Sequence, residues 1–234
     1  MLQPSNATLW VRCPLAGNVL SSGQYHATHN PHAVEGDARR EGTCAHWAAE
    51  AVLTDRAETV AELIGQVHPN GWVVDEEMAR HAQAYVDYVR SFGPVIAAER
   101  TVELWGLVRG RLDTAVISNG GTLHLFDFKY GYRLVEAEEN WTNALYGISI
   151  HSGYRRLNLH IFQPRPHHPD GPTRVWSHAW SEVLNVAQWL HGRAQACFDA
   201  PKGQPGTHCT DCPANRSCHA FAATNYYQTS VIQD

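Results

Sequence analysis

The sequence predicts an α/β fold in which a mixed, mostly antiparallel central sheet is flanked by helices. Apolar residues recur at helical spacing up to about residue 92, and from about Ala98 the spacing changes to a period of two. Hydrophobic residues make up 44% of the chain and charged residues 18%, which is enough apolar surface for a buried core. The order of helices, strand meander, helix and further strands places one sheet between helical layers.

The individual elements follow from the same periodicities. Helices are expected at 5–13, 43–64, 75–92, 138–154 and 181–198, and strands at 99–106, 108–117, 122–130, 157–163 and 174–180. Pro14 is expected to end the first helix, and Asn119-Gly120 to form the turn between the second and third strands. Residues 23–40 lack periodicity and contain several helix breakers, so a mobile loop is expected there.

Four cysteines lie near the two ends of the chain. Three of them, near the C-terminus, follow a Cys-x2-Cys-x5-Cys spacing: Cys209, Cys212 and Cys218. The fourth, Cys13, precedes the rest of the fold. Four thiolates are enough for an iron–sulfur cubane or for a zinc ion, and the tight spacing favours metal over disulfides. The two remaining cysteines, Cys44 and Cys197, are expected to be buried thiols.

A chain of 234 residues fits a single domain. We expect a core at about 40–200, with the metal-binding cysteines on flanking segments 5–22 and 201–225. The sequence contains no apolar run of membrane-spanning length and no signal peptide, so a cytoplasmic protein without membrane contacts is expected. The formal net charge of −5 is unusual for a nonspecific DNA binder, although arginines such as Arg109 and Arg111 could supply a local basic rim that contacts a nucleic acid.

Two carboxylates and a lysine form the strongest catalytic pattern. Asp127 and Lys129 are two residues apart in a strand, so their side chains leave the same face of the sheet as Leu125. The expected turn places Asp113 opposite Phe126, diagonal to Asp127. Two oxygen ligands beside a positive charge are what a metal-dependent phosphodiesterase needs. The alternative is an ordinary surface Asp–Lys pair, which the apolar surroundings LHLFDFKY disfavour.

These motifs resemble the RecB-like branch of the PD-(D/E)xK nuclease superfamily. The resemblance rests on Gly110-Arg111-Leu112-Asp113, on Phe126-Asp127-Phe128-Lys129, and on an upstream Glu41-Gly42-Thr43-Cys44-Ala45-His46. It implies a restriction-endonuclease-like core in which Lys129 is catalytic. The metal ligands that it implies, for Mg²⁺ or Mn²⁺, are His46, Asp113, Asp127 and the carbonyl of Phe128.

The resemblance is incomplete on the helix after the lysine strand. The branch carries a Gln-x3-Tyr motif there; Tyr146 fits and is the implied DNA contact, but Thr142 stands at the glutamine position. Glu50, one helical turn beyond His46, could join the site by spacing alone.

The cysteine order also resembles the iron–sulfur members of this branch, which include CRISPR-associated RecB-like exonucleases and phage exonucleases. The resemblance implies a structural [4Fe–4S] cluster that joins the terminal segments, with zinc as the alternative that spacing leaves open. The implied function is a metal-dependent nuclease, an exonuclease on single-stranded DNA or DNA ends, in the cytoplasm of a bacterium or of a phage-infected host. The other hypothesis is a non-catalytic DNA-binding or assembly module stabilised by the cluster or by zinc.

Partners follow from the same resemblance. A helicase, a recombination protein or a CRISPR adaptation protein would provide the substrate, and a homo-oligomer that threads one DNA end is compatible with the hypothesis. His26, His29 and His32 repeat at a spacing of three within the expected loop. They are expected to be loop residues that gate access to the site rather than ligands of a second metal.

Overall fold

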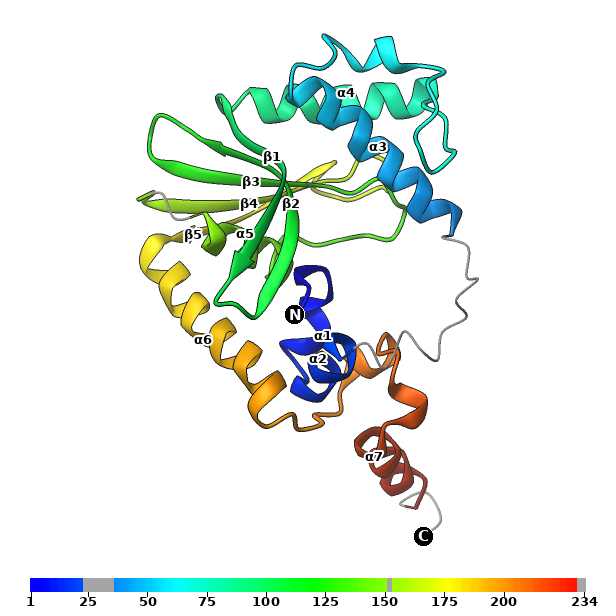
Figure 1. Cartoon of the computed structure of the whole chain (residues 1–234), viewed down its shortest axis with the longest axis vertical. Helices are drawn as coiled ribbons and strands as arrows, with labels where there is room; N and C mark the ends of the chain where they lie inside the picture. The colour runs from blue at the N-terminus through cyan, green and yellow to red at the C-terminus, as the bar shows by residue number, and fades with distance from the viewer. Residues whose placement is uncertain (23–35, 151–152, 231–234) are drawn as a thin grey trace. The chain divides into compact units, whose positions relative to one another are not determined.

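A five-stranded mixed sheet is the centre of the fold, as the sequence predicts (Figure 1). The computed structural model describes residues 1–22, 36–150 and 153–230. The strands lie in chain order: β1 (Val95–Leu104), β2 (Val108–Ile117), β3 (Thr122–Phe128), β4 (Arg156–Phe162) and β5 (Thr173–Ala179). β3 is antiparallel to β2 and parallel to β4, and β5 is antiparallel to β4. The parallel pair requires a crossover, and α5 (Trp141–Ser149) provides it.

The described residues form two compact units. One consists of the described residues up to 22 together with Glu103–Gly110 and the residues from Leu184 onward. The other consists of the described residues from 36 to Val102 together with Arg111–Val183, and it contains most of the sheet. The expectation of a single domain with a core at about 40–200 stays a prediction.

Helices cover both faces of the sheet in the second unit (Figure 1). α3 (Asp37–Leu53) and α4 (Glu76–Arg90) pack on the face that carries Phe126 and Phe128, and α5 packs against β3 and β4 on the other. Asp75 caps α4 by accepting a 2.7 Å hydrogen bond from the backbone N–H of Met78. Gly147 of α5 lies against Leu157, where a Cβ atom would come within 2.5 Å of that side chain. The glycine therefore allows the helix to approach the sheet closely.

Several element bounds differ from the sequence prediction. α3 begins at Asp37, within the expected loop, and ends at Leu53 instead of continuing to residue 64. Its end follows from Asp55, whose φ of +57° is left-handed, and a separate 3₁₀ helix η2 (Val60–Leu63) begins at a Thr59–Glu62 capping box. Pro14 starts a helix, α2 (Pro14–Ser21), because proline is favoured in a first turn whose N–H groups have no helical partners.

The β2–β3 hairpin has a register one residue away from the predicted one. Thr114 pairs with Phe126, and extension of this register by one residue sets Asp113 opposite Asp127 rather than Phe126. The turn is a three-residue loop, closed by a hydrogen bond from Ser118 N–H to the carbonyl of Thr122, and Gly121 adopts a φ of +70°. A left-handed glycine at the end of such a loop replaces the two-residue Asn-Gly turn.

A chain of buried hydrogen bonds crosses the strand face under α4. Tyr88 Oη lies 2.8 Å from His160 Nδ1, His160 Nε2 lies 3.0 Å from His124 Nδ1, and His124 Nε2 lies 3.3 Å from Ser118 Oγ. Two neutral imidazoles satisfy this chain, because each ring donates one hydrogen bond and accepts one. Burial lowers the pKa of His160 to about 3, with a further contribution from His124, and burial also lowers the pKa of His124.

The buried histidine pair predicts a loss of stability in mild acid. A folded-state pKa below the unfolded value of 6.5 means that the unfolded chain binds more protons as the pH falls, so stability is lost below about pH 6.5. For His160 alone the loss between pH 7 and pH 5 is about 2 kcal/mol. Urea unfolding of wild type and His160→Phe at the two pH values should show a smaller loss in the variant. Equal losses would contradict the neutral buried pair.

The first unit is built from the terminal segments. It contains 3₁₀ helix η1 (Pro4–Asn6), α1 (Ala7–Trp10), α2, most of α6 (Trp180–Asp199), 3₁₀ helices η3 (Thr207–Thr210) and η4 (Asn215–Ser217), and α7 (His219–Ser230). The short α1 and η1 replace the helix expected at 5–13. Arg193 of α6 donates to the carbonyl of Val11, and Asn18 Nδ2 donates to the carbonyl of Cys197 at 2.9 Å. In the described part of the chain, no helix combines the length and the apolar character that a membrane crossing requires.

Candidate active site

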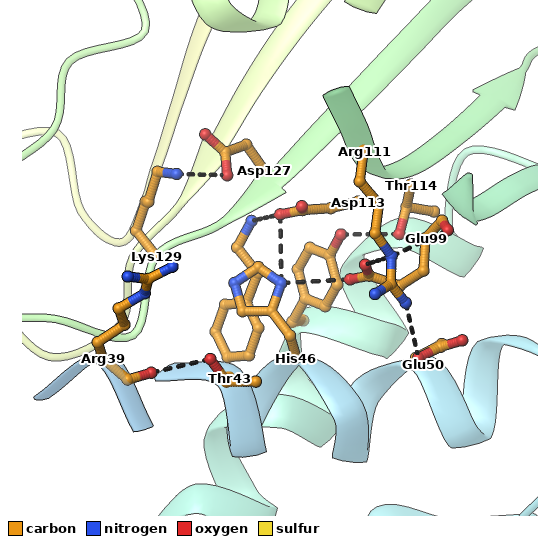
Figure 2. A network of polar contacts seen from close by, with 12 residues as sticks. Arg39, Thr43, His46, Glu50, Glu99, Arg111, Asp113, Thr114, Asp127 and Lys129 are labelled. Carbon is orange, nitrogen blue, oxygen red and sulfur yellow. Dashed lines mark hydrogen bonds and ion pairs between the residues drawn. The ribbon is translucent and has the colours of Figure 1, made fainter. Parts of the chain in front are cut away.

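α3 brings His46 to the edge of the sheet. The helix buries alanines and Cys44 against the core, and His46 lies at the margin of that face, with its side chain 27% exposed. Its ring packs against Phe128 of β3 with ring centroids 5.5 Å apart. His46 Nδ1 lies 3.4 Å from a carboxylate oxygen of Asp113 on β2 (Figure 2). The predicted histidine and the first predicted acid therefore meet.

The two predicted acids converge at the same place. Asp113 Oδ2 accepts a 3.0 Å hydrogen bond from the backbone N–H of Phe128, which anchors the carboxylate to β3. Asp127 is 6% exposed, and its Oδ2 atom has no hydrogen-bond partner among the described residues. An unpartnered buried carboxylate oxygen is costly, and a cation bound at this point would satisfy it. The role of the Phe128 carbonyl as a ligand stays a prediction.

Lys129 pairs with Asp127 as the strand period predicts. Its Nζ lies 2.7 Å from Asp127 Oδ1 (Figure 2). Burial alone would lower the pKa of Lys129, but the charges of Asp127 and Asp113 outweigh it and raise the pKa. The lysine is therefore held as a cation next to both acids.

Glu99 of β1 is a site residue that the sequence analysis missed. Glu99 Oε1 lies 3.4 Å from His46 Nδ1, and donor atoms of His46, Glu99 and Asp113 all lie within 4.8 Å of one another. Glu99 has a φ of +46°, a left-handed conformation that costs a non-glycine residue on the order of 1 kcal/mol. An acid within a strand was the one available signal, but strand alternation does not predict this backbone turn.

Arg111 is engaged by acids of the site. Its Nε lies 2.6 Å from Glu99 Oε2 and donates to the backbone carbonyl of Glu99 at 3.0 Å. Its Nη2 lies 3.6 Å from Glu50 Oε2 (Figure 2). Glu50 therefore lies beside the site, as spacing suggested, and Arg111 holds both glutamates. A contact of Arg111 with substrate stays a prediction.

The close carboxylates of Asp113, Asp127 and Glu99 favour a positive charge at this site. Burial raises the pKa of Asp113, Asp127 raises it further, and His46 opposes the shift. For His46, burial lowers the pKa, but Asp113 and Glu99 outweigh it and raise the pKa to about 9. A proton on His46 thus balances charge where carboxylate oxygens and an imidazole nitrogen converge. That donor set fits a divalent ion such as Mn²⁺ or Mg²⁺.

An open cleft of about 670 Å³ lies over these residues. Its lining includes His46, Glu99, Asp113 and Lys129, together with further residues of α3. Glu99 and Asp113 are therefore accessible to a ligand much larger than an ion.

Tyr146 lies close to the same acids from α5. Burial and the charges of Asp113 and Asp127 raise the pKa of its hydroxyl, and the nearby backbone of Arg111 opposes this rise. Thr142 lies in the first turn of the same helix, whose cap is Asn140, accepting from the N–H of Asn143 at 3.2 Å. The tyrosine half of the expected motif is thus near the acids, and its contact with DNA stays a prediction.

The four predicted cysteines come together in the first unit. They line a cavity of about 390 Å³: Cys13, Cys209, Cys212 and Cys218. Burial raises the pKa of Cys212, and the other three cysteines raise it further. Backbone N–H groups of Gln204 and Gly206 donate to the sulfurs of Cys13 and Cys209, each at 3.4 Å. Converging sulfurs that accept backbone hydrogen bonds fit a four-thiolate metal centre.

The remaining cysteines behave as expected, because Cys44 and Cys197 are free thiols with no exposed surface. Burial raises the pKa of each to about 11. His26, His29 and His32 lie outside the described residues, so the expectation for them stays a prediction.

Comparison with known proteins identifies a family. Residues 1–231 match the family described as "Protein of unknown function (DUF2800)". The chain belongs to this family. Among solved structures it is similar to that of SSO0001, with 12% identity, 94% of this chain and 85% of that chain covered, and a TM-score of 0.41. It is also similar to a "putative exonuclease" from Eubacterium rectale, with 11% identity, coverage of 92% and 87%, and a TM-score of 0.46.

Proposed function

We propose that this DUF2800 protein is a Mg²⁺- or Mn²⁺-dependent deoxyribonuclease that hydrolyses phosphodiester bonds in single-stranded DNA or at DNA ends. The observation that carries the proposal is that Asp113, His46 and Lys129 line one cleft, while buried Asp127 lies 2.7 Å from Lys129 and has an unpartnered carboxylate oxygen. The PD-(D/E)xK resemblance of the same residues supports it independently of the geometry.

Each side chain has a distinct part in this proposal. Asp113, Asp127 and His46 would hold the divalent ion, with the Phe128 carbonyl as a further ligand. The bound ion would neutralise the phosphodiester charge and acidify water. Lys129, held as a cation beside Asp127, orients the attacking water or stabilises the negative charge that develops on the phosphate. Tyr146 contacts the substrate strand from α5.

Glu99 extends this ligand set. Its distance to His46 places it within reach of the same ion or of a second one, and its salt bridge with Arg111 fixes its position. Arg111 in turn neutralises part of the charge of Glu50 and Glu99, which reduces the repulsion that an incoming phosphate meets.

The four cysteines would hold a [4Fe–4S] cluster, which stabilises the unit formed by the terminal segments. A zinc ion would satisfy the same thiolates. The proposed setting is the cytoplasm of a bacterium or of a phage-infected cell. There a helicase, recombination or CRISPR adaptation partner provides DNA, and a homo-oligomer could thread one end.

A direct test is a nuclease assay on end-labelled single-stranded and duplex DNA with Mn²⁺, Mg²⁺ or a chelator. We expect metal-dependent cleavage of single strands or ends and none in Asp127→Ala. DNA binding without cleavage by wild type under every condition would overturn the proposal and favour the non-catalytic module.

His46→Ala is expected to raise the Mn²⁺ concentration needed for half-maximal cleavage on the order of 10-fold, because one ligand is lost. Wild type should be more active with Mn²⁺ than with Mg²⁺, since imidazole suits Mn²⁺ better. A matched control is His178→Ala, which removes a half-buried histidine of β5. A metal titration that is the same in His46→Ala and wild type would return His46 to a structural role.

A further inference from the structure

The cleft extends along α3 beyond the candidate metal site. Residues of that helix between Arg39 and Glu50 line it, and eleven steps along the helix at a rise of 1.5 Å span about 16 Å. Figure 2 shows Arg39, Thr43, His46 and Glu50 in succession along this helix. The acids occupy only part of this length, so the cleft has room for more than one phosphate.

Two aromatic rings form a corner in the wall of this cleft. Trp47, the residue after His46, and His68 both line it, and their ring centroids are 5.6 Å apart at an interplanar angle of 66°. Both residues are half-buried. Trp47 packs against the core behind it. Rings in this T-shaped arrangement allow a flat base to stack on one ring while its edge meets the other.

The position of His68 is fixed by a tight turn. Gly71, at a φ of +84°, donates to the carbonyl of His68 at 2.8 Å, and His68 N–H donates to the carbonyl of Trp72 at 2.8 Å. Arg40 of α3 donates to the carbonyl of Asn70 at 2.8 Å, and Asn70 Nδ2 donates back to the carbonyl of Arg40 at 2.8 Å. These bonds attach the turn to the helix that carries Trp47, so the corner exists before any ligand binds.

The polar groups of the cleft suit a nucleic acid strand. His68 Nδ1 accepts the backbone N–H of Asn70 at 3.1 Å, so a neutral ring carries its proton on Nε2 and can donate to a base or phosphate. Arg39 and Lys129 also line the cleft and supply positive charge for phosphates. An unpaired base has an exposed face for stacking, whereas a base inside a duplex has none.

We propose that Trp47 and His68 hold one unpaired base of the substrate by stacking, next to the phosphate at the metal site, and thereby select single-stranded DNA. The inference rests on the proposed function for the location of the cleaved phosphate. The stacking contact itself is a binding property, so it is measured without cleavage.

The experiment couples a protein change with a DNA change. Fluorescein-labelled single strands, each with one abasic nucleotide at a different position, are titrated with full-length protein in Ca²⁺, and gels verify that the strands stay intact. Trp47→Ala should weaken binding of the intact strand on the order of 10-fold. One abasic position should weaken wild-type binding by a similar factor and have no further effect on Trp47→Ala. Trp47→Phe should retain most of the affinity, and fully paired duplex should bind more weakly than single strands.

The controls separate stacking from folding and from catalysis. Trp189→Ala removes an exposed tryptophan of α6 and should bind every strand as wild type does. Circular dichroism tests the fold of Trp47→Ala, and if that variant is misfolded, His68→Ala, which removes the other ring, replaces it in the same titrations. The inference would be overturned if Trp47→Ala weakened the binding of every strand, intact or abasic, by the same factor. It would also be overturned if wild type did not bind single strands. If the abasic nucleotide and Trp47→Ala show coupled effects at one position but the protein never cleaves DNA, the proposed nuclease function is overturned and the stacking inference stands.

Discussion

Lys129→Ala is expected to lower the rate of DNA cleavage on the order of 100-fold or more while divalent metal binding is retained. The Nζ of Lys129 lies 2.7 Å from buried Asp127 while its own side chain is half-buried, so its charge is only partly screened by solvent. Loss of one preorganised group that stabilises transition-state charge typically has an effect of this size. Metal binding should stay the same or tighten, because a cation next to the ligands is removed.

Asp127→Ala should behave differently from Lys129→Ala. It removes a ligand and the charge that attracts the ion, so both Mn²⁺ binding and cleavage should be lost. The measurements are Mn²⁺ titration by electron paramagnetic resonance and single-turnover cleavage, with DNA binding followed by fluorescence anisotropy. Lys202, the other lysine of the sequence, is exposed, and Lys202→Ala is the matched control. Cleavage by Lys129→Ala at the wild-type rate would exclude the proposed catalytic role.

The parts of this site that sequence predicted are those that depend on local periodicity. Asp127 lies in β3 and Lys129 directly follows the last residue of that strand, so a period of two sufficed to place them together, and the apolar residues around them indicated a buried strand. His46 followed from the motif resemblance, and α3 brings it to the sheet as expected. The mixed sheet with helices on both faces followed from the order of the elements.

The parts that the sequence did not predict depend on backbone conformations, because the same residues are compatible with more than one conformation. Ser118-Asn119-Gly120-Gly121 is compatible with a two-residue turn at Asn119-Gly120 and with a three-residue loop that ends at Gly121. The structure has the second, so the register moves by one residue and Asp113 meets Asp127 directly. Glu99 joins the site through a left-handed backbone conformation that alternation cannot predict.

The sequence also did not predict which charged side chains form ion pairs across the site. Arg111 was expected on a basic rim, and its guanidinium instead lies between Glu50 and Glu99, 2.6 Å from the second. Both glutamates come from other elements, and their positions depend on how α3 and β1 pack against β2. Charge patterns along a chain identify such residues but not their partners.

Cys209→Ser is expected to remove metal from the four-cysteine centre and to destabilise the unit built from the terminal segments. Structural metal binding contributes on the order of 10 kcal/mol to the folding of small metal-dependent segments, and η3, η4 and the loops between them bury few other residues. Cys209 is one of the few buried residues in that region. Its loss should therefore affect local folding as well as metal content.

Anaerobically purified wild type should be brown with about four iron atoms per chain, and Cys209→Ser should lose the colour and become prone to proteolysis after residue 200. Cys197→Ala is the matched control. Cys197 is a fully buried thiol of α6 whose sulfur donates to the carbonyl of Arg193 at 3.3 Å, and it does not line the four-cysteine cavity. Its replacement should leave the iron content unchanged. Colourless wild-type protein with one zinc ion per chain would exclude the iron–sulfur assignment while leaving the four-thiolate centre in place, because both metals accept the same ligands.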